Sequence, residues 1–212
     1  MRIANVFLVF FLFQANHLPQ NSRLYTMVDS ISNYIISDEF EKLKSNNSDI
    51  ELIDSIYVFA LRINDYNLRE TLLSLTFATL PFNHVPITTP FIGVKIKYPL
   101  ITSPQNVFLK KVEKMPGRFF YDTPDNDFGD KDKLAHFFGN AFVAYSLNFF
   151  ELTSIIGYFV EVFEETLKVS KFDKRDIRAN RLGELFGKQL SKNEDALPSK
   201  LFIIFNLQNI RY

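Results

Sequence analysis

The chain has 212 residues, of which 47% are hydrophobic, a composition typical of one globular domain and too polar for a protein that crosses a membrane many times. Its 24 basic and 24 acidic residues balance, and no basic stripe with interleaved aromatic residues is present, so we expect no nucleic-acid partner. The absence of cysteine excludes disulfides, thiolate metal sites and cysteine nucleophiles.

The first residues have the pattern of an export signal. Arg2 precedes an uncharged run from Ile3 to Phe13, which has the length of a signal-peptide hydrophobic region. A bilayer span needs about 20 apolar residues, more than this run supplies. We expect residues 1–15 to be an export signal cleaved near Ala15, with an uncleaved anchor or a buried N-terminal strand as the alternatives. The predicted location is therefore the periplasm or the membrane-associated cell envelope.

The region 16–79 is expected to be helical. Apolar residues recur at helical spacing and predict amphipathic helices over about 24–43, 50–64 and 67–78. The third of these begins at Asn67, with Glu70 three positions later as in a capping box.

The region 80–130 reads as a connecting region rich in proline and aspartate. Its prolines exclude a long helix, and "FIGVKIKYPL" alternates as one short strand or an extended segment would. Ser103 and Pro104 fit the N-cap and first position of a small helix ending near Lys114. The loop over residues 122–132 is rich in aspartate, but Gly129 does not stand at the position that an EF-hand calcium loop requires for its glycine. We expect Asp130 or Asp132 to cap the next helix and the other acids to be solvated, with an irregular calcium site as the alternative.

The region 131–192 is expected to be a unit of three helices, over about 133–150, 152–167 and 175–190, followed by a tail at 193–212 that ends in a strand or a helix. The longest uncharged run in this unit, Phe137 to Phe150, is shorter than a normal bilayer span. We therefore favour helices buried in protein over helices embedded in lipid.

Each of the three helices carries polar residues at four-residue spacing, which places them on one face. Rows of alanine and glycine lie beside these residues and allow the helices to approach closely. Close approach predicts a buried structural polar cluster made of Asp132, Lys133, His136, Asn140, Glu161, Asp176 and Asn180.

Two interpretations of this cluster stay open: a chemical site, either catalytic or metal-binding, and a structural network. Carboxylates around one imidazole suit proton transfer, with His136, Glu161 and Asp176 as candidate catalytic residues. The same chemistry suits a divalent metal held by His136, Glu161, Glu165 and Asp176. We favour the other interpretation, a hydrogen-bonded network that fixes helix register, and so expect no cofactor, with a divalent metal as the alternative.

Three segments together resemble a known family. "DKLAHFF", "GYFVEVFEE" and "FDKRDIRANRLGELFG" are similar to the VanZ-like pattern of an Asp-Lys-x-x-His opening, a helix with a Glu, and a closing Asp-x-x-x-Asn-x-x-Gly-x-x-x-Gly. The matching positions are Asp132, Lys133, His136, Glu161, Asp176, Asn180, Gly183 and Gly187. The chain is also similar to a related group of small bacterial envelope proteins, often lipoproteins, with no assigned activity. The resemblance implies an envelope protein.

The sequence thus predicts a mainly α fold: N-terminal helices, a proline-rich extended segment, and a C-terminal three-helix unit with a buried polar cluster. The expected function is that of an exported, membrane-associated bacterial envelope protein without enzymatic activity, whose partner is membrane lipid or an envelope component. The alternative is a metal-dependent or acid/base hydrolase or transferase acting on a lipid or cell-wall component.

Overall fold

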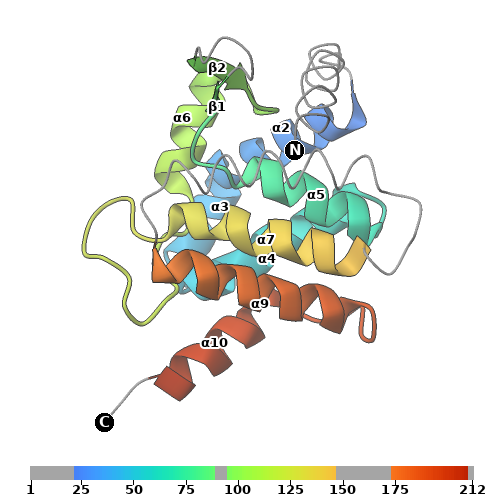
Figure 1. The fold of residues 1–212 in the computed structure, drawn as a ribbon, viewed down its shortest axis with the longest axis vertical. Coiled ribbons are helices and arrows are strands. Elements are labelled where there is room, and N and C mark those ends of the chain that lie inside the picture. The colour runs from blue at the N-terminus through green and yellow to red at the C-terminus, as the bar shows by residue number, and fades with distance from the viewer. Residues whose placement is uncertain (1–21, 89–94, 147–172, 210–212) are drawn as a thin grey trace.

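The computed structural model describes residues 22–88, 95–146 and 173–209, which form a mainly helical fold with one small sheet (Figure 1). This confirms the predicted fold class. The expected export segment at 1–15 and the helix expected over 152–167 lie outside the described residues.

The N-terminal region begins with two helices where the sequence predicted one. Helix α2 (Arg23–Ile36) is followed by α3 (Asp38–Lys44). Ser37 ends the first helix by donating its backbone N–H to the Tyr34 carbonyl, and its side chain accepts from the Phe40 N–H at the start of the second. The prediction was wrong because the apolar stripe continues across this break, with Ile35 and Phe40 both fully buried.

Helices α4 (Asp49–Ile63) and α5 (Leu68–Ala78) confirm the next two predictions. Ser48 and Glu51 form a reciprocal capping box at the start of α4. The Asn67 side chain accepts from the Glu70 N–H at the start of α5, as expected.

The connecting region contains a hairpin of β1 (His84–Thr88) and β2 (Lys95–Pro99), paired antiparallel with Val85 opposite Tyr98. The sequence predicted one strand, within "FIGVKIKYPL", and missed β1 because it contains Pro86. Proline is tolerated here because both strands of a two-stranded sheet have an open edge. Helix α6 (Gln105–Lys114) follows, but Pro104 and not Ser103 is at its N-cap position, with no side-chain cap.

The C-terminal part contains α7 (Lys131–Ser146), α9 (Lys174–Leu190) and α10 (Pro198–Asn209), so the end of the tail is a helix. Helices α7 and α9 make the most extensive helix contact of the described structure and lie side by side (Figure 1). Helix α5 packs against α7, and α10 packs on α4 and α9. None of the helices within the described ranges has both the length and the apolarity needed to cross a bilayer.

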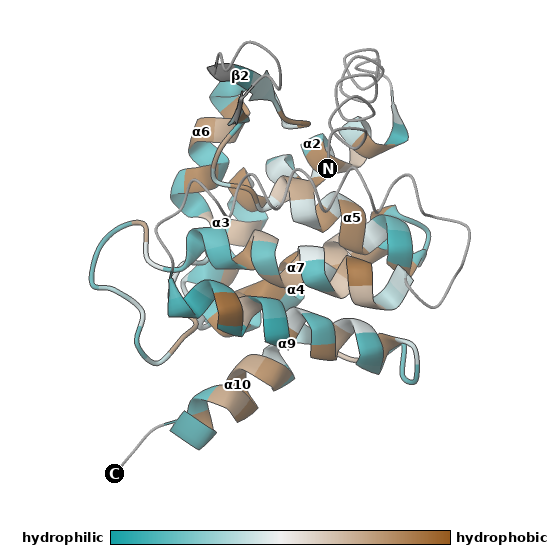
Figure 2. Ribbon diagram, viewed as in Figure 1, coloured by the Kyte–Doolittle hydropathy of each residue, from teal (hydrophilic) through white to brown (hydrophobic). Residues whose placement is uncertain are grey.

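Aromatic side chains fill the core beneath these helices. The Phe137 ring centroid lies 5.3 Å from that of Phe186 and 4.8 Å from that of Phe202, and Phe119 lies 5.1 Å from Phe202. These contacts join α7, α9, α10 and the loop before α7. Figure 2 shows that α9 is largely hydrophilic along its length, whereas α10 carries a run of hydrophobic residues.

Candidate functional site

The candidate site lies where α7 and α9 approach each other most closely. A Cβ atom at Gly183 would collide with the Phe137 carbonyl, and one at Gly187 would collide with the Ala141 carbonyl. Both contacts join residues 46 positions apart in the sequence, so the two helices run in the same direction with this register (183 − 137 = 46, 187 − 141 = 46). The predicted row of small residues thus brings the polar faces of α7 and α9 together.

Lys133 is at the centre of the cluster. Its Nζ atom lies 2.5 Å from Asp176 Oδ1, 2.7 Å from Asp132 Oδ2 and 3.2 Å from Asp173 Oδ2. The lysine side chain is only 4% exposed and that of Asp176 only 6%. A buried ammonium is tolerated when carboxylates pair with it, and three surround this one. The sequence placed Lys133 in the cluster without indicating this central position.

His136 is oriented by two asparagines. Its Nδ1 lies 3.1 Å from Asn180 Oδ1, and Asn140 Nδ2 donates to the same oxygen and to the His136 carbonyl. The carbonyl only accepts, so the Asn140 amide nitrogen must face it, and Asn180 presents an oxygen to the ring. The Nδ1 atom therefore carries the proton, and Nε2 points toward Asp176 Oδ1 at 3.6 Å.

The pKa directions follow from burial and from these partners. Burial lowers the pKa of His136 below its ordinary value, and the nearby carboxylates of Asp176 and Asp132 offset part of this change. Burial also lowers the pKa of Lys133, but its hydrogen bonds to Asp132 and Asp176 outweigh it, and the pKa is raised. The lysine is the permanent cation of the site, and the imidazole is held toward its neutral form.

Asp173 caps α9 and belongs to the same charge network. Its side chain accepts from the Arg175 backbone N–H, and its Oδ2 pairs with the Arg175 guanidinium at 2.6 Å. Burial raises the pKa of Asp173, but the bonds from Arg175 and the Lys133 ammonium outweigh it and lower the pKa to about 2. The sequence analysis did not single out this residue, although an aspartate directly before a helix is a recognisable N-cap signal.

The aspartate-rich loop is held by buried contacts that the sequence did not reveal. Asp130 is fully buried and accepts from the Phe119 and Phe120 N–H groups and from the Thr123 hydroxyl. Arg175 Nη1 donates to its other oxygen at 2.6 Å. Asp130 directly precedes α7, but its side chain bonds to the loop and to Arg175 and does not cap the helix, so that part of the expectation is wrong. The other acids of the loop, Asp122, Asp125 and Asp127, are exposed, as expected.

A metal ligand set is present among the described residues. Asp132, His136 and Asp176 each offer one ligand atom, and these atoms all lie within 4.8 Å of one another. One imidazole and two carboxylates suit several divalent metals. The Asn180 oxygen on Nδ1 is the kind of outer contact that orients a metal-binding histidine. The Lys133 ammonium, however, occupies the shared side of the two carboxylates.

Glu161 and Glu165 lie outside the described residues. Of the predicted cluster, the structure brings together Asp132, Lys133, His136, Asn140, Asp176 and Asn180.

The cluster lines neither of two cavities that lie among the described residues. One lies against α2, α5 and α7 and the other beside the aspartate-rich loop, and neither is lined by Asp132, His136 or Asp176. No family model, curated protein or solved structure matches this chain. The VanZ-like resemblance accordingly stays a prediction from the sequence.

Proposed function

We propose that this chain is an exported protein of the bacterial cell envelope that acts by binding and not by catalysis, and that the α7–α9 charge cluster fixes the register of its C-terminal helices. The observation that carries the second part is the position of the Lys133 ammonium, within 3.2 Å of three carboxylates from the two helices. The Lys133 ammonium neutralises these carboxylates, as a bound metal cation would.

The orientation of His136 supports the same proposal. A general base presents a ring nitrogen to its substrate. Here Nδ1 bonds to Asn180 and Nε2 faces the buried Asp176 carboxylate. Both ring nitrogens are therefore directed at the protein, which suits a network that specifies helix pairing.

The envelope assignment is supported by the sequence and by the surface of α10. The run from Ile3 to Phe13 and the VanZ-like positions favour export. Ile203, Ile204 and Leu207 on α10 are 44%, 52% and 68% exposed. Exposed apolar side chains on one helix favour contact with lipid or with an envelope partner.

Cell fractionation tests the location. With the full chain expressed in a bacterium, we expect it in the envelope fraction and released from membranes by a carbonate wash, as a peripheral protein is. Recovery in the cytosolic fraction would contradict the proposal, and resistance to carbonate would contradict the peripheral part of it.

A metal-dependent activity is the second candidate, favoured by the convergence of Asp132, His136 and Asp176. Metal analysis of the purified full chain, with His136→Ala as the comparison, separates the two. The structural proposal expects no stoichiometric metal and a lower melting temperature for the variant. Stoichiometric zinc or manganese that is lost in His136→Ala would favour the metal site instead.

A further inference from the structure

The outer face of α10 is apolar and exposed to solvent. Lys200, Ile203, Ile204 and Leu207 follow the i, i+3, i+4, i+7 spacing of one helix face, and all four are exposed. The opposite face is apolar too, with Phe202 fully buried in the core. A surface helix of a globular protein usually turns polar residues outward, and one that is apolar on both faces is typical of a helix covered by something else.

An exposed tyrosine lies beside this helix. Tyr121 is 48% exposed directly before the aspartate-rich loop, and its ring centroid lies 6.2 Å from that of Phe205 on α10. The Arg178 guanidinium of α9, which pairs with Asp122, lies 5.3 Å from the Tyr121 ring centroid and 5.9 Å from that of Phe205. Tyrosine and arginine both combine an apolar body with a polar end, as side chains at the boundary between lipid and water do.

The segment that contains α9 and α10 is positively charged. Residues 174–209 include seven Lys or Arg and four Asp or Glu, a net charge of +3, whereas the whole chain is balanced. Both acids of α9 have a lysine partner, while Lys174 and Arg181 are exposed and form no ion pair within the described ranges. The other two acids, Glu194 and Asp195, lie in the loop before α10. The balance of charge around α10 therefore suits an anionic surface.

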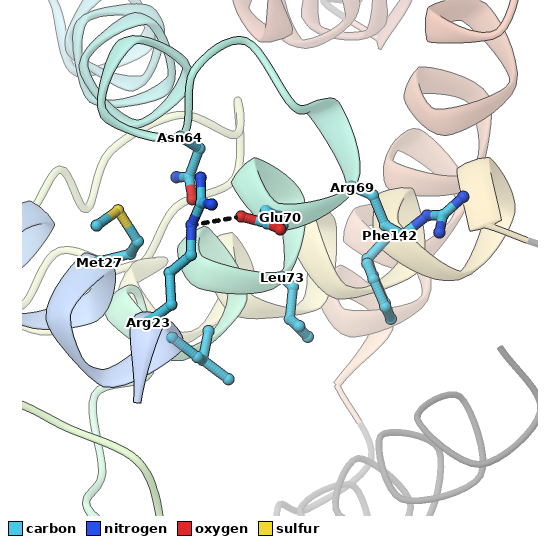
Figure 3. A pocket seen from close by; sticks show the side chains of 8 residues that line it. Arg23, Met27, Asn64, Arg69, Glu70, Leu73 and Phe142 are labelled. Carbon is cyan, nitrogen blue, oxygen red and sulfur yellow. Dashed lines mark ion pairs between the residues drawn. The ribbon is translucent and has the colours of Figure 1, made fainter. Parts of the chain in front are cut away.

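The size of the apolar face favours lipid over a protein partner. A stable contact between proteins buries about 800 Å² on each partner. A fully exposed aliphatic side chain offers about 100 Å² to bury, so three partly exposed ones supply less than half of that area. A bilayer sets no such minimum, because apolar side chains enter the acyl boundary individually. No residue of α10 lines the cavity against α2, α5 and α7 (Figure 3) or the one beside the aspartate-rich loop, so neither cavity extends to this face.

We propose that α10 docks on the surface of an anionic lipid bilayer, with Ile203, Ile204 and Leu207 in the acyl boundary and Tyr121 and Lys200 at the level of the head groups. So small an apolar anchor binds lipid reversibly and needs a second attraction, which the positive charge of this segment supplies. The inference rests on the proposed envelope function, for which it names the partner.

Sedimentation with lipid vesicles tests the partner on the purified full chain. The vesicles are phosphatidylcholine alone and phosphatidylcholine with one-third phosphatidylglycerol. We expect tighter binding to the anionic vesicles, by about fivefold for each basic residue close to the lipid, and weaker binding at high salt. Absence of binding, or equal binding to both vesicles, overturns the proposal. A dimer in analytical ultracentrifugation that Leu207→Gln dissociates would overturn it as well, because a second copy of the chain would then cover this face.

Two tryptophan variants test the place, since the chain has no tryptophan of its own. Leu207→Trp should show blue-shifted fluorescence, quenched by brominated acyl chains, when anionic vesicles are added. Leu109→Trp, at a 57% exposed position of α6 at the opposite end of the molecule (Figure 1), should show neither change. Equal responses of the two variants would show that α10 does not enter the lipid.

A matched pair of polar variants tests the contribution of the face to affinity. Leu207→Gln should weaken binding to the anionic vesicles about tenfold, while Leu109→Gln leaves it unchanged. The run from Ile3 to Phe13 is present in both variants, so its own affinity for lipid does not produce a difference between them. Unchanged binding in Leu207→Gln overturns the proposal.

The vesicle and fractionation experiments fail separately. Vesicle binding by a chain that is recovered in the cytosolic fraction of cells would contradict the envelope function alone. Loss of vesicle binding by a chain that is recovered in the envelope fraction would contradict lipid docking by α10 alone.

Discussion

Lys133 Nζ lies 2.5 Å from Asp176 Oδ1, so the closest helix pair of the described structure is joined by a buried ion pair. Removing two charges from water costs several kcal/mol for each ion, and good geometry with further partners is needed to offset that cost. Asp132 and Asp173 supply those partners on the lysine side. The pair therefore specifies how α7 and α9 fit together more than it adds net stability.

The first prediction concerns the loss of this cation. Lys133→Met is expected to lower the free energy of unfolding by about 3–5 kcal/mol, because it leaves the Asp132 and Asp176 carboxylates buried without their counterion. Urea unfolding followed by circular dichroism measures the change.

A matched variant and a double variant sharpen that measurement. Lys188→Met removes a 61% exposed lysine from its pair with Glu184 and should cost less than about 1 kcal/mol. Lys133→Met combined with Asp176→Asn should recover part of the loss, because both ends of the buried pair are then neutral. A cost for Lys133→Met no greater than that of Lys188→Met would show that the cluster does not hold the helices together.

The second prediction concerns the close approach of α7 and α9. Gly183→Ala places a methyl group against the Phe137 carbonyl, so we expect it to destabilise the protein by about 1–3 kcal/mol. Helix propensity alone predicts the opposite sign, a gain of up to about 1 kcal/mol. Thermal unfolding decides between them, with Glu184→Ala, the neighbouring exposed position, as the control expected within about 0.5 kcal/mol.

Much of the helical framework was predictable because its signals are local. The boundaries of α4 and α5 follow from apolar periodicity together with Ser48 and Asn67 as caps. The break at Ser37 was missed because apolar residues on both sides face the same core, so periodicity does not register the change. Strand β1 was missed because a proline in a short segment weakens any strand pattern.

The candidate site was predictable in membership and not in arrangement. Four-residue spacing placed His136 and Asn140 on one face of α7 and Asp176 and Asn180 on one face of α9. Which charged side chain lies at the centre of the cluster depends on the register between α7 and α9. That register is set by contacts between residues far apart in the sequence. Lys133 and the buried Asp130 owe their roles to α9, where Asp176 and Arg175 meet them.

The third prediction concerns acid. Because the folded-state pKa of Asp173 is lowered to about 2, its contribution to stability is fully present above its ordinary pKa of 3.8 and is lost as the pH falls toward 2. The side chain is 26% exposed, so water screens part of the effect and we expect a loss of at most about 2 kcal/mol. The measurement is urea unfolding at several pH values between 5 and 2.

Asp173→Asn keeps the α9 cap and removes the titrating group, so its stability should vary less over that range than that of the unaltered chain. Asp125→Asn, which changes a 97% exposed carboxylate paired with Arg118, should leave the profile parallel to the original. Parallel profiles for the unaltered chain and Asp173→Asn would contradict the role given to Asp173.

The last prediction concerns alkali and a different buried lysine. Lys111 on α6 is 1% exposed, its Nζ donates to the Leu80 carbonyl at 2.6 Å, and the same atom lies 4.7 Å above the Phe108 ring. No carboxylate of the described residues forms an ion pair with it, and burial lowers its pKa to about 7. Between pH 7 and about 10.5, the unfolded chain thus binds more protons at this position than the folded chain does.

Stability should consequently rise with pH in that window, since folding no longer has to bury a charge. Between pH 7 and pH 9, we expect the free energy of unfolding of the unaltered chain to rise by about 2 kcal/mol relative to that of the Lys111→Met variant. Lys110→Met, at the adjacent exposed position of α6, removes a charge without altering burial and should run parallel to the unaltered chain. If the difference between the unaltered chain and Lys111→Met is constant across these pH values, the ammonium of Lys111 keeps its proton in the folded protein and has a partner that the Leu80 carbonyl does not supply.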